Sequence, residues 1–309
     1  MLFRSQSGYA FTEFLVPRSY ADKYNLISCA LGHHTYESRW LRDPQYLQDN
    51  LKVWFRGNNG GQMAYLRKFS SWTADALYNS WLVTGDRGFT VEMFSDLHEE
   101  YRLWENDHRL PSGLFWQYDV ADGMEESISG GRREKNARPT INSYMYGNAR
   151  ALSSIAEMAG RKDLAAVYMA KADTLKKLVE TKLWNSDDRF FEVRKEDDSF
   201  SVAREAIGFI PWYFNLPSKG FEAAWAQITD EYGFYAPFGL TTAERRHPEF
   251  RSHGCCNCEW DGAVWPFATS QTLTGLANLL NNYDQDIIND SIFFRCMDKI
   301  GRASCRERV

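Results

Sequence analysis

The sequence is built from pairs of amphipathic helical segments joined by short polar breaks. In one pair, apolar residues recur every three or four positions from Met63 to Thr84, Gly85 and Asp86 interrupt the pattern, and a second periodic stretch runs from Phe89 to about Trp104. Further pairs are predicted at 141–159 and 164–184, at 263–282 and 284–299, and, more weakly, at 20–31 and 43–56. Repeated antiparallel helix pairs predict a mainly α fold, either a solenoid or a closed toroid of hairpins.

The connections between the pairs favour the toroid. A solenoid repeats a short signature in every unit, and these pairs share none. Long connections at 107–140, 185–220 and 232–262 separate the pairs, and loops of that length inside a compact domain usually carry function. We therefore expect a helical barrel with one active face. Because no Pro/Ser-rich linker or charge block divides the chain, residues 1–299 are expected to form a single domain.

Composition and charge argue against several classes of protein. The chain of 309 residues carries a formal net charge of -5 and has no basic stripe to neutralise a phosphate backbone, so nucleic acid is not an expected partner. No apolar run of about 18 residues is present, so no membrane span is expected, and the N-terminus does not read as a signal peptide. Phosphate-binding glycine loops and the GxSxG and HExxH motifs are absent as well.

The aromatic content is high, with 11 Trp, 16 Tyr and 20 Phe making up 15% of the chain. Trp and Tyr carry polar edges that need partners when they are buried. Such an excess is therefore expected either on a concave surface that stacks flat ligands, such as sugar rings, or in aromatic-rich helix packing. Both interpretations stay open at this point.

The C-terminal segment from Ile300 to Val309 differs from the rest of the chain. It resembles the translation of a common sequencing-adapter oligonucleotide, and its charges and Cys305 interrupt the apolar spacing of the preceding segment. We expect Ile300–Val309 to be a non-native tail on a domain that is truncated after Lys299.

Four carboxylates crowd the first long connection. The stretch between Leu110 and Thr140 contains Asp119, Asp122, Glu125 and Glu126, together with Trp116, Tyr118, Arg132, Arg133 and Arg138. Like charge and desolvation both favour the neutral form of a carboxyl group, so pKa values in such a cluster should be mutually perturbed. A carboxylic acid that stays neutral near pH 7 is what general-acid cleavage of a glycosidic bond requires. A solvated acidic turn or a cation site would show the same spacing.

A second cluster combines carboxylates with indoles. Between Arg245 and Trp265 lie Glu249, Glu259, Asp261 and Trp260. Trp stacks on the C–H face of a sugar while a carboxylate accepts its hydroxyls, so this pattern predicts a carbohydrate subsite. The alternative is that the two Trp side chains only plug the start of the next helix. A weaker group at 33–44 adds Trp40 as a sugar-binding candidate.

Cysteines and histidines are dense in the same region. Cys255, Cys256, Cys258, His247 and His253 could bind zinc or supply a thiolate nucleophile. No second Cys/His pair lies at ligand spacing elsewhere, and a closed structural zinc site needs four ligands. We therefore expect free thiols or a strained disulfide and no metal or organic cofactor, with cysteine- or zinc-dependent chemistry as the alternative.

Three stretches carry a resemblance to a known family. GLFWQYDVADGMEESISG, RPTINSYMYGNARALSSIAEMAG and CEWDGAVWPFATSQTLTGLANLL follow one another with helical hairpins between them. Over about residues 30–299 the chain resembles the six-hairpin glycosidases, specifically bacterial glycoside hydrolase family 63 and the related mannosylglycerate-hydrolase-like domains. The resemblance implies an (α/α)6 barrel, here incomplete because twelve helices would be needed, and an inverting, exo-acting hydrolase of an oligosaccharide or small glycoside. It leaves the compartment open between bacterial cytoplasm and periplasm.

The resemblance also assigns roles to residues. The acid lies in a motif similar to Gly-Met-Asp-Asn-Ser, which corresponds to Gly123–Ser127 and makes Glu125 the acid candidate, with Asp122 and Glu126 as alternatives because the family has Asp at that position. Asp261 stands in a WRGPVW-like segment where Arg is usual. Stacking on the sugar is expected from Trp116, Tyr118, Trp260 and Trp265, and hydroxyl binding from Asp119, Arg138, Asn142 and Asp261.

The family's second carboxylate, the general base, would follow Lys299 and is expected to be missing from this sequence. The fragment could then be inactive by itself. A non-catalytic carbohydrate-binding toroid is the alternative from a different functional class.

Overall fold

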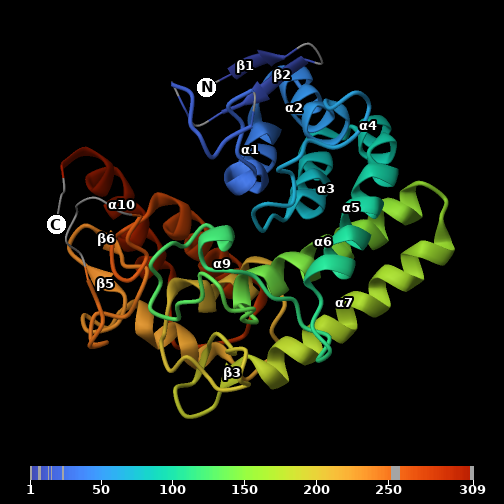
Figure 1. Cartoon of the computed structure of the whole chain (residues 1–309). Coiled ribbons are helices and arrows are strands. Elements are labelled where there is room, and N and C mark those ends of the chain that lie inside the picture. Colours follow the sequence, from blue (N-terminus) through green and yellow to red (C-terminus); the bar gives the residue numbers. More distant parts are fainter. Residues whose placement is uncertain are drawn as a thin grey trace. The chain divides into compact units, whose positions relative to one another are not determined.

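The computed structural model of the chain describes residues 2–5, 8–12, 14, 16–22, 24–251 and 258–306. Within these residues helices dominate, and the paired strands form three short two-stranded antiparallel sheets (Figure 1). The expected mainly α fold is confirmed. The chain separates into two compact units, Met1–Arg109 with Tyr144–Asp173, and Leu110–Ser143 with Thr174–Val309. The single domain expected over 1–299 stays a prediction.

Within its described residues, the first unit contains five α-helices and most of a long helical hairpin. The hairpin consists of α6 (Pro139–Met158) and α7 (Lys162–Lys182), and the division between the units falls inside both helices. The chain reverses at Gly160, whose φ of 74° is in the left-handed region that glycine adopts without strain. The other elements are β1 (Leu2–Ser5), β2 (Gly8–Phe11), η1 (Ser28–Ala30), α1 (Leu31–Glu37), η2 (Ser38–Trp40), α2 (Gln45–Arg56), α3 (Thr73–Thr84), α4 (Arg87–Glu92) and α5 (Phe94–His108).

Helix α3 begins at Thr73, although apolar periodicity predicts a helix from Met63. The Asn148 side chain on α6 explains the later start. Its Oδ1 atom accepts hydrogen bonds from the backbone nitrogens of Ala74 and Asp75 at 3.0 and 3.3 Å, and its Nδ2 atom donates to the Ser71 carbonyl at 3.0 Å. A long-range cap therefore satisfies the first free N–H groups of α3 and fixes its N-terminus.

Two other helix predictions are wrong in their bounds. The described residues between 20 and 31 are mostly irregular, because the Asp22 side chain accepts hydrogen bonds from the backbone nitrogens of Tyr24 and Leu26, each at 2.8 Å, and so closes a turn. Helix α10 (Asp290–Arg306) starts later than 284, because the Gln285 Oε1 atom accepts from two following backbone nitrogens. The helix continues to Arg306, into the segment expected to be non-native; that origin stays a prediction.

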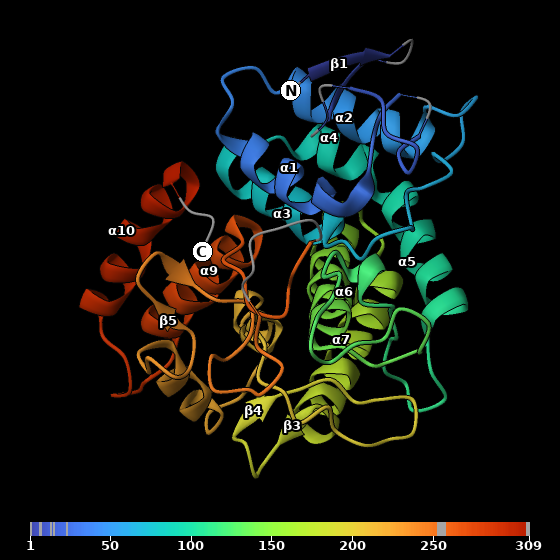
Figure 2. The same ribbon diagram turned by 60° about the vertical axis from the view of Figure 1, so that its left-hand side comes forward.

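The second unit combines the longer helices α9 and α10 with short helices and long irregular segments. Helix α9 (Pro266–Asn282) packs against α8 (Ile210–Tyr213), and Asn278 Nδ2 donates to the Trp212 and Tyr213 carbonyls at 3.0 and 2.8 Å. Helix α10 also packs against α9 (Figure 1 and Figure 2). The remaining elements are η3 (Val120–Asp122), β3 (Trp184–Asn185), β4 (Phe190–Phe191), η4 (Ala206–Phe209), η5 (Glu222–Ile228), β5 (Tyr235–Ala236) and β6 (Gly239–Leu240).

An aromatic cluster forms the core of the second unit. Phe209 packs edge-on against Phe190, with ring centroids 5.0 Å apart, and tilted against Trp225 at 4.6 Å, while Trp212 meets Trp225 at 5.5 Å. All four rings are at most 1% exposed. Much of the aromatic excess in the sequence is therefore explained by packing, the second of the two interpretations left open by composition.

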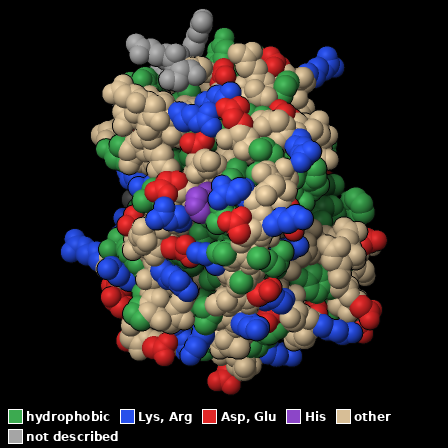
Figure 3. All heavy atoms as spheres, turned by 90° about the vertical axis from the view of Figure 1, so that its right-hand side faces the viewer, with side chains coloured by type: hydrophobic (Ala, Val, Ile, Leu, Met, Phe, Trp, Pro, Cys, Tyr) green, Lys and Arg blue, Asp and Glu red, His purple; other side chains and the backbone are tan. Residues whose placement is uncertain are grey.

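The charges of the surface show no field of one sign on the face drawn in Figure 3, where blue and red side chains are interspersed. Among the described residues, no helix combines the length and the apolar character that a bilayer crossing needs.

Candidate active site

The four carboxylates of the first cluster lie on one folded loop, but in different environments. Asp122 belongs to the interior: the Arg138 Nε atom donates to its Oδ2 atom at 3.0 Å, Thr140 Oγ1 donates to the same oxygen, and neither side chain of the ion pair is exposed. A carboxylate enclosed in this way cannot reach a bound ligand without breaking its ion pair. The geometry gives Asp122 a structural role.

Asp119 caps the short η3 helix. Its side chain accepts a hydrogen bond from the Val120 nitrogen at 2.5 Å, and its carbonyl accepts one from the Met124 nitrogen at 2.9 Å. Burial raises the pKa of Asp119, while the nearby Arg138 guanidinium acts in the opposite direction. Asp119 also borders the pocket described below.

Glu125 is half-buried and is not held in an ion pair within the described residues. Burial raises its pKa, Arg132 counteracts the shift, and the charges of Asp119 and Glu126 add to it. Desolvation together with like charge is the combination that keeps a carboxyl group protonated toward neutral pH.

Glu126 has a different environment, although it is the next residue. Its Oε1 atom accepts from Arg132 Nη2 at 2.8 Å, and its Oε2 atom lies 3.9 Å from Arg251 Nη2. Its backbone φ is 63°, in the left-handed region that a non-glycine residue enters only at a cost. Glu126 therefore pairs with two partly exposed guanidinium groups from a strained piece of backbone.

The second cluster meets the first through the backbone of Glu125. The Trp260 nitrogen donates to the Glu125 carbonyl at 3.1 Å, although the two residues are far apart in sequence. The rings of Trp260 and Trp265 stack with centroids 5.3 Å apart and an interplanar angle of 2°. Trp265 Nε1 donates to the Glu259 carbonyl at 2.9 Å, which fixes the second indole just before α9. The indole pair and the acidic loop therefore lie together.

Asp261 is buried and forms an ion pair with Arg251. The backbones of the two residues are also joined, since the Arg251 nitrogen donates to the Asp261 carbonyl at 3.0 Å. Between the two segments, a Cβ atom on Gly262 would come within 1.9 Å of the Arg251 carbonyl oxygen, so only glycine fits there. At the position where the resemblance implies an Arg, this chain has a carboxylate that pairs with Arg251 of a neighbouring segment.

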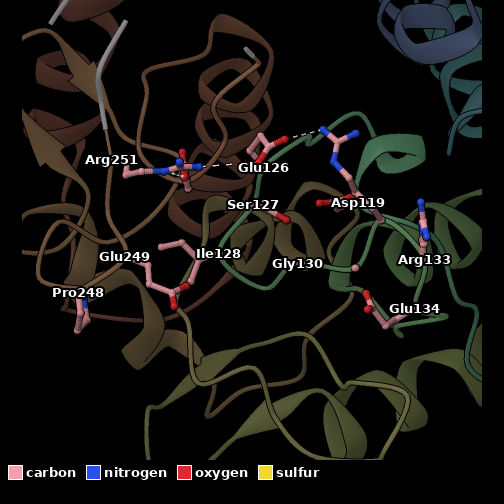
Figure 4. A pocket seen from close by; sticks show the side chains of 13 residues that line it. Asp119, Glu126, Ser127, Ile128, Gly130, Arg133, Glu134, Pro248, Glu249 and Arg251 are labelled. Atoms are coloured by element: carbon pink, nitrogen blue, oxygen red, sulfur yellow. Dashed lines mark hydrogen bonds and ion pairs between the residues drawn. The ribbon is translucent and has the colours of Figure 1, made fainter. Parts of the chain in front are cut away.

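Asp119, Glu126, Arg251 and Asp261 border a pocket of about 670 Å³, a size that suits a small sugar ligand, whereas Trp260 and Trp265 are not among its lining residues. Figure 4 shows Arg251 and Glu126 joined across it by dashed lines. The lining residues come from both clusters: Asp119, Glu126, Ser127, Ile128, Gly130, Gly131, Arg132, Arg133, Glu134, Pro248, Glu249, Arg251 and Asp261. Glu125 does not belong to this lining as the described residues define it; it lies one residue away from it.

The other predicted sugar-binding residues have varied surroundings. Trp116 is largely buried, with Tyr118 edge-on at 5.0 Å and the Lys135 ammonium group 4.9 Å from its ring centre. Asn142 is fully buried and exchanges hydrogen bonds with the Phe115 nitrogen and carbonyl, each at 2.8 Å. Trp40 is exposed and belongs to the first unit.

Arg138 is completely buried and does not line the pocket. Sequence reasoning predicts that its guanidinium group binds sugar hydroxyls, because the burial of a side chain cannot be read from a loop sequence. It also missed Glu205, a buried carboxyl group that accepts from the Ser129 nitrogen at 3.4 Å and whose pKa is raised by burial. No local spacing connects Glu205 with the acidic loop.

The alternative of cysteine- or zinc-dependent chemistry rests partly on Cys255, Cys256 and His253, which lie outside the described residues. Cys258 is a free thiol on an exposed residue, and partial desolvation of its sulfur, followed by the charge of Glu125, raises its pKa. Within the described part of the chain, no group of three or more Cys, His, Asp or Glu side chains is arranged to hold a metal ion.

Solved structures define the class of this fold. The GH63 mannosylglycerate hydrolase from Thermus thermophilus in complex with glucose matches with a TM-score of 0.72 at 14% identity, over 94% of this chain and 87% of that chain. Neutral trehalase from Saccharomyces cerevisiae matches with a TM-score of 0.62 at 14% identity, over 85% and 63%. The fold is therefore of the (α/α)6 class, as expected.

The family follows from the sequence itself. The model of the mannosylglycerate hydrolase MGH1-like glycoside hydrolase domain matches residues 23–308, and the chain belongs to this family. A solved protein named sialidase is 59% identical, with a TM-score of 0.94 over 96% of this chain. The chain spans 28% of the length of that relative. No curated protein matches the sequence. The expected glycoside hydrolase domain is confirmed.

Proposed function

We propose that this domain hydrolyses an O-glycosidic bond with inversion at the anomeric carbon, and that Glu125 is the general acid. The observation that carries the assignment is the hydrogen bond from the Trp260 nitrogen to the Glu125 carbonyl, which joins the acidic loop to the stacked indoles. Membership of a glycoside hydrolase family supports the reaction class.

Comparison of the three acid candidates favours Glu125. Asp122 is enclosed by Arg138, and Glu126 is paired with Arg132 and Arg251. Glu125 is half-buried, and burial raises its pKa, so it can carry a proton to the leaving oxygen. Trp260 and Trp265 are proposed to bound the sugar, with Asp119 and Asp261 accepting its hydroxyl groups; Trp116 and Tyr118 stay candidates for stacking.

Inversion requires a second carboxylate that activates water, roughly 6.5–9.5 Å from the acid. We propose, from the family resemblance, that this base lies C-terminal to Lys299. Among the described pocket residues, Glu249 is an exposed carboxylate from the 232–262 connection, drawn beside Ile128 in Figure 4, and is a second candidate.

The substrate is proposed to be an oligosaccharide or small glycoside cleaved from its end. The names of the relatives suggest which sugars to try: mannosides and glucosides from the family and its structures, and sialosides from the larger, 59% identical relative. Aryl glycosides of these sugars form the first panel.

The acid assignment is tested with Glu125→Gln on two glycosides of the same active sugar. A general acid contributes about 10²–10⁴-fold when the leaving group is poor, and much less when it is a weakly basic phenolate. We expect Glu125→Gln to lose most activity on an alkyl glycoside and little on a dinitrophenyl glycoside, whereas Glu249→Gln should lose activity on both if Glu249 is the base.

Equal losses of Glu125→Gln on the two leaving groups would contradict the assignment. An NMR record of the first anomer released tests inversion separately. Tight sugar binding by the wild-type chain without turnover would favour the non-catalytic alternative, and zinc-dependent turnover would favour the cysteine alternative.

A further inference from the structure

The strongest unexplained feature of the second unit is a completely buried guanidinium group. Arg138 immediately precedes Pro139, the first residue of α6, and its side chain is 0% exposed. A charged side chain of this kind is almost never fully buried unless it is paired and hydrogen-bonded. Its partners therefore indicate what it stabilises.

The partners of Arg138 span the acidic loop. On one side its Nε atom donates to Asp122 Oδ2 at 3.0 Å. On the other side its Nη1 atom donates to Ser129 Oγ and to the Gly130 carbonyl, both at 3.2 Å, and its Nη2 atom donates to Ser127 Oγ at 3.4 Å. One planar group thus joins residues 122 and 127–130, and the segment between them contains Glu125 and Glu126.

A second layer lies behind these contacts. Glu205, which comes from the segment before η4, accepts from the Ser129 nitrogen at 3.4 Å, and the Arg138 charge acts on it as well as on Asp119. The buried guanidinium group of Arg138 therefore holds the loop from its inner side. Its planar fork of N–H donors contacts several loop residues at once, which the single ammonium group of a lysine cannot do.

We propose that Arg138 is a positioning residue that holds the 122–130 loop in the shape that presents Glu125 to the substrate. This inference rests on the proposed function for its catalytic consequence. Arg138 acts through Asp122, Ser127 and Ser129. Its guanidinium group is buried and does not line the pocket, so it would not contact a ligand bound there. The direct hydroxyl-binding role expected from the sequence is replaced by an indirect one.

The test is amide hydrogen exchange on the full chain carrying Arg138→Lys, which keeps the charge but loses the fork. We expect faster exchange in the peptides covering 120–131 and unchanged exchange in the α9 peptides. The matched control is Arg204→Lys, because Arg204 is another largely buried arginine of the same unit that forms ion pairs, with Asp188 and Glu244. Among the described residues, the side-chain hydrogen bonds and ion pairs of Arg204 do not involve the 120–131 segment.

Kinetics on the alkyl glycoside of the active sugar, whose poor leaving group depends on the acid, give the second readout. Displacing an acid by about 1 Å costs on the order of 10²-fold in rate, so Arg138→Lys should lower kcat roughly 10²-fold with little change in KM. The double variant Ser127→Ala with Ser129→Ala removes two acceptors while keeping the buried ion pair. It should shift loop exchange in the same direction even if Arg138→Lys folds poorly.

The outcomes separate this inference from the proposed function. Unchanged exchange of 120–131 in both Arg138→Lys and the double serine variant overturns the positioning role, whatever the activity of Glu125→Gln. Faster loop exchange with wild-type kcat on a poor leaving group also overturns it, because the loop would then not position the acid. Equal loss of Glu125→Gln on both leaving groups refutes only the acid assignment, and the exchange result still decides whether Arg138 holds the loop.

Discussion

A buried carboxyl group outside the acidic loop gives the sharpest prediction about stability. Glu192 is 1% exposed and follows β4, and its Oε2 atom accepts a hydrogen bond from Asn185 Nδ2 at 3.0 Å. Burial raises its pKa from 4.5 to about 8, and a hydrogen bond with Asp188 adds to the shift, while Asn185 and Arg204 act against it. The folded protein therefore holds a proton on Glu192 that the unfolded chain releases.

The sign of the pH dependence follows from this difference. The stabilisation is fully present below the unfolded-state pKa and is lost as pH rises through the folded-state pKa, so the window runs from about 4.5 to about 8. At about 1.4 kcal/mol per pKa unit, the full shift corresponds to roughly 4–5 kcal/mol across that window.

The perturbation is Glu192→Gln. Glutamine has the shape of the protonated acid, can accept from Asn185 and can donate to Asp188, so it should keep the contacts without the titration. We expect the free energy of unfolding of the variant, relative to wild type, to rise between pH 5 and pH 8 by at least about 2 kcal/mol.

Urea unfolding at several pH values, followed by tryptophan fluorescence, measures this difference. Glu196→Gln is the control, because Glu196 is exposed on the same segment. If the stability difference between Glu192→Gln and wild type stays within about 0.5 kcal/mol from pH 5 to pH 8, the reasoning is refuted.

Three further predictions concern the cap of α3, the pocket and the indole pair. Asn148→Ala should destabilise the protein by about 2 kcal/mol, because it leaves buried N–H groups of α3 without an acceptor; urea unfolding beside the exposed Asn281→Ala measures it. Arg251→Gln should raise KM for the active glycoside more than it lowers kcat, since it breaks the ion pair with Asp261 at the pocket wall, and an unchanged KM would remove Asp261 from the subsite. Trp265→Leu should weaken sugar binding by about 1 kcal/mol while secondary structure is retained, as judged by calorimetric titration and circular dichroism.

Local periodicity was sufficient to predict most of the helices. The hairpin formed by α6 and α7 is predicted nearly to its ends, because apolar spacing and a glycine break are properties of neighbouring residues. The start of α3 was not predictable, because its cap comes from Asn148 on another helix. Side-chain caps that cross the chain leave no local signal.

The candidate site shows the same division. The sequence shows Glu125 close to other acidic residues and Asp261 close to Trp residues. The structure brings these two clusters together. The burial of Arg138 was not visible, because a guanidinium in a polar loop looks the same whether it faces a ligand or the interior. The roles of these residues stay proposals until the variants are measured.

The contact at Gly262 limits how the pocket can diversify. Since any side chain there would collide with the backbone of Arg251, neither natural variation nor directed evolution is expected to yield a tolerated substitution at position 262. Under the proposed function, altered sugar preference is expected from exchanges at 251 and 261 that keep the two charges matched. A library built on this domain should randomise positions 251 and 261 together and leave Gly262 unchanged.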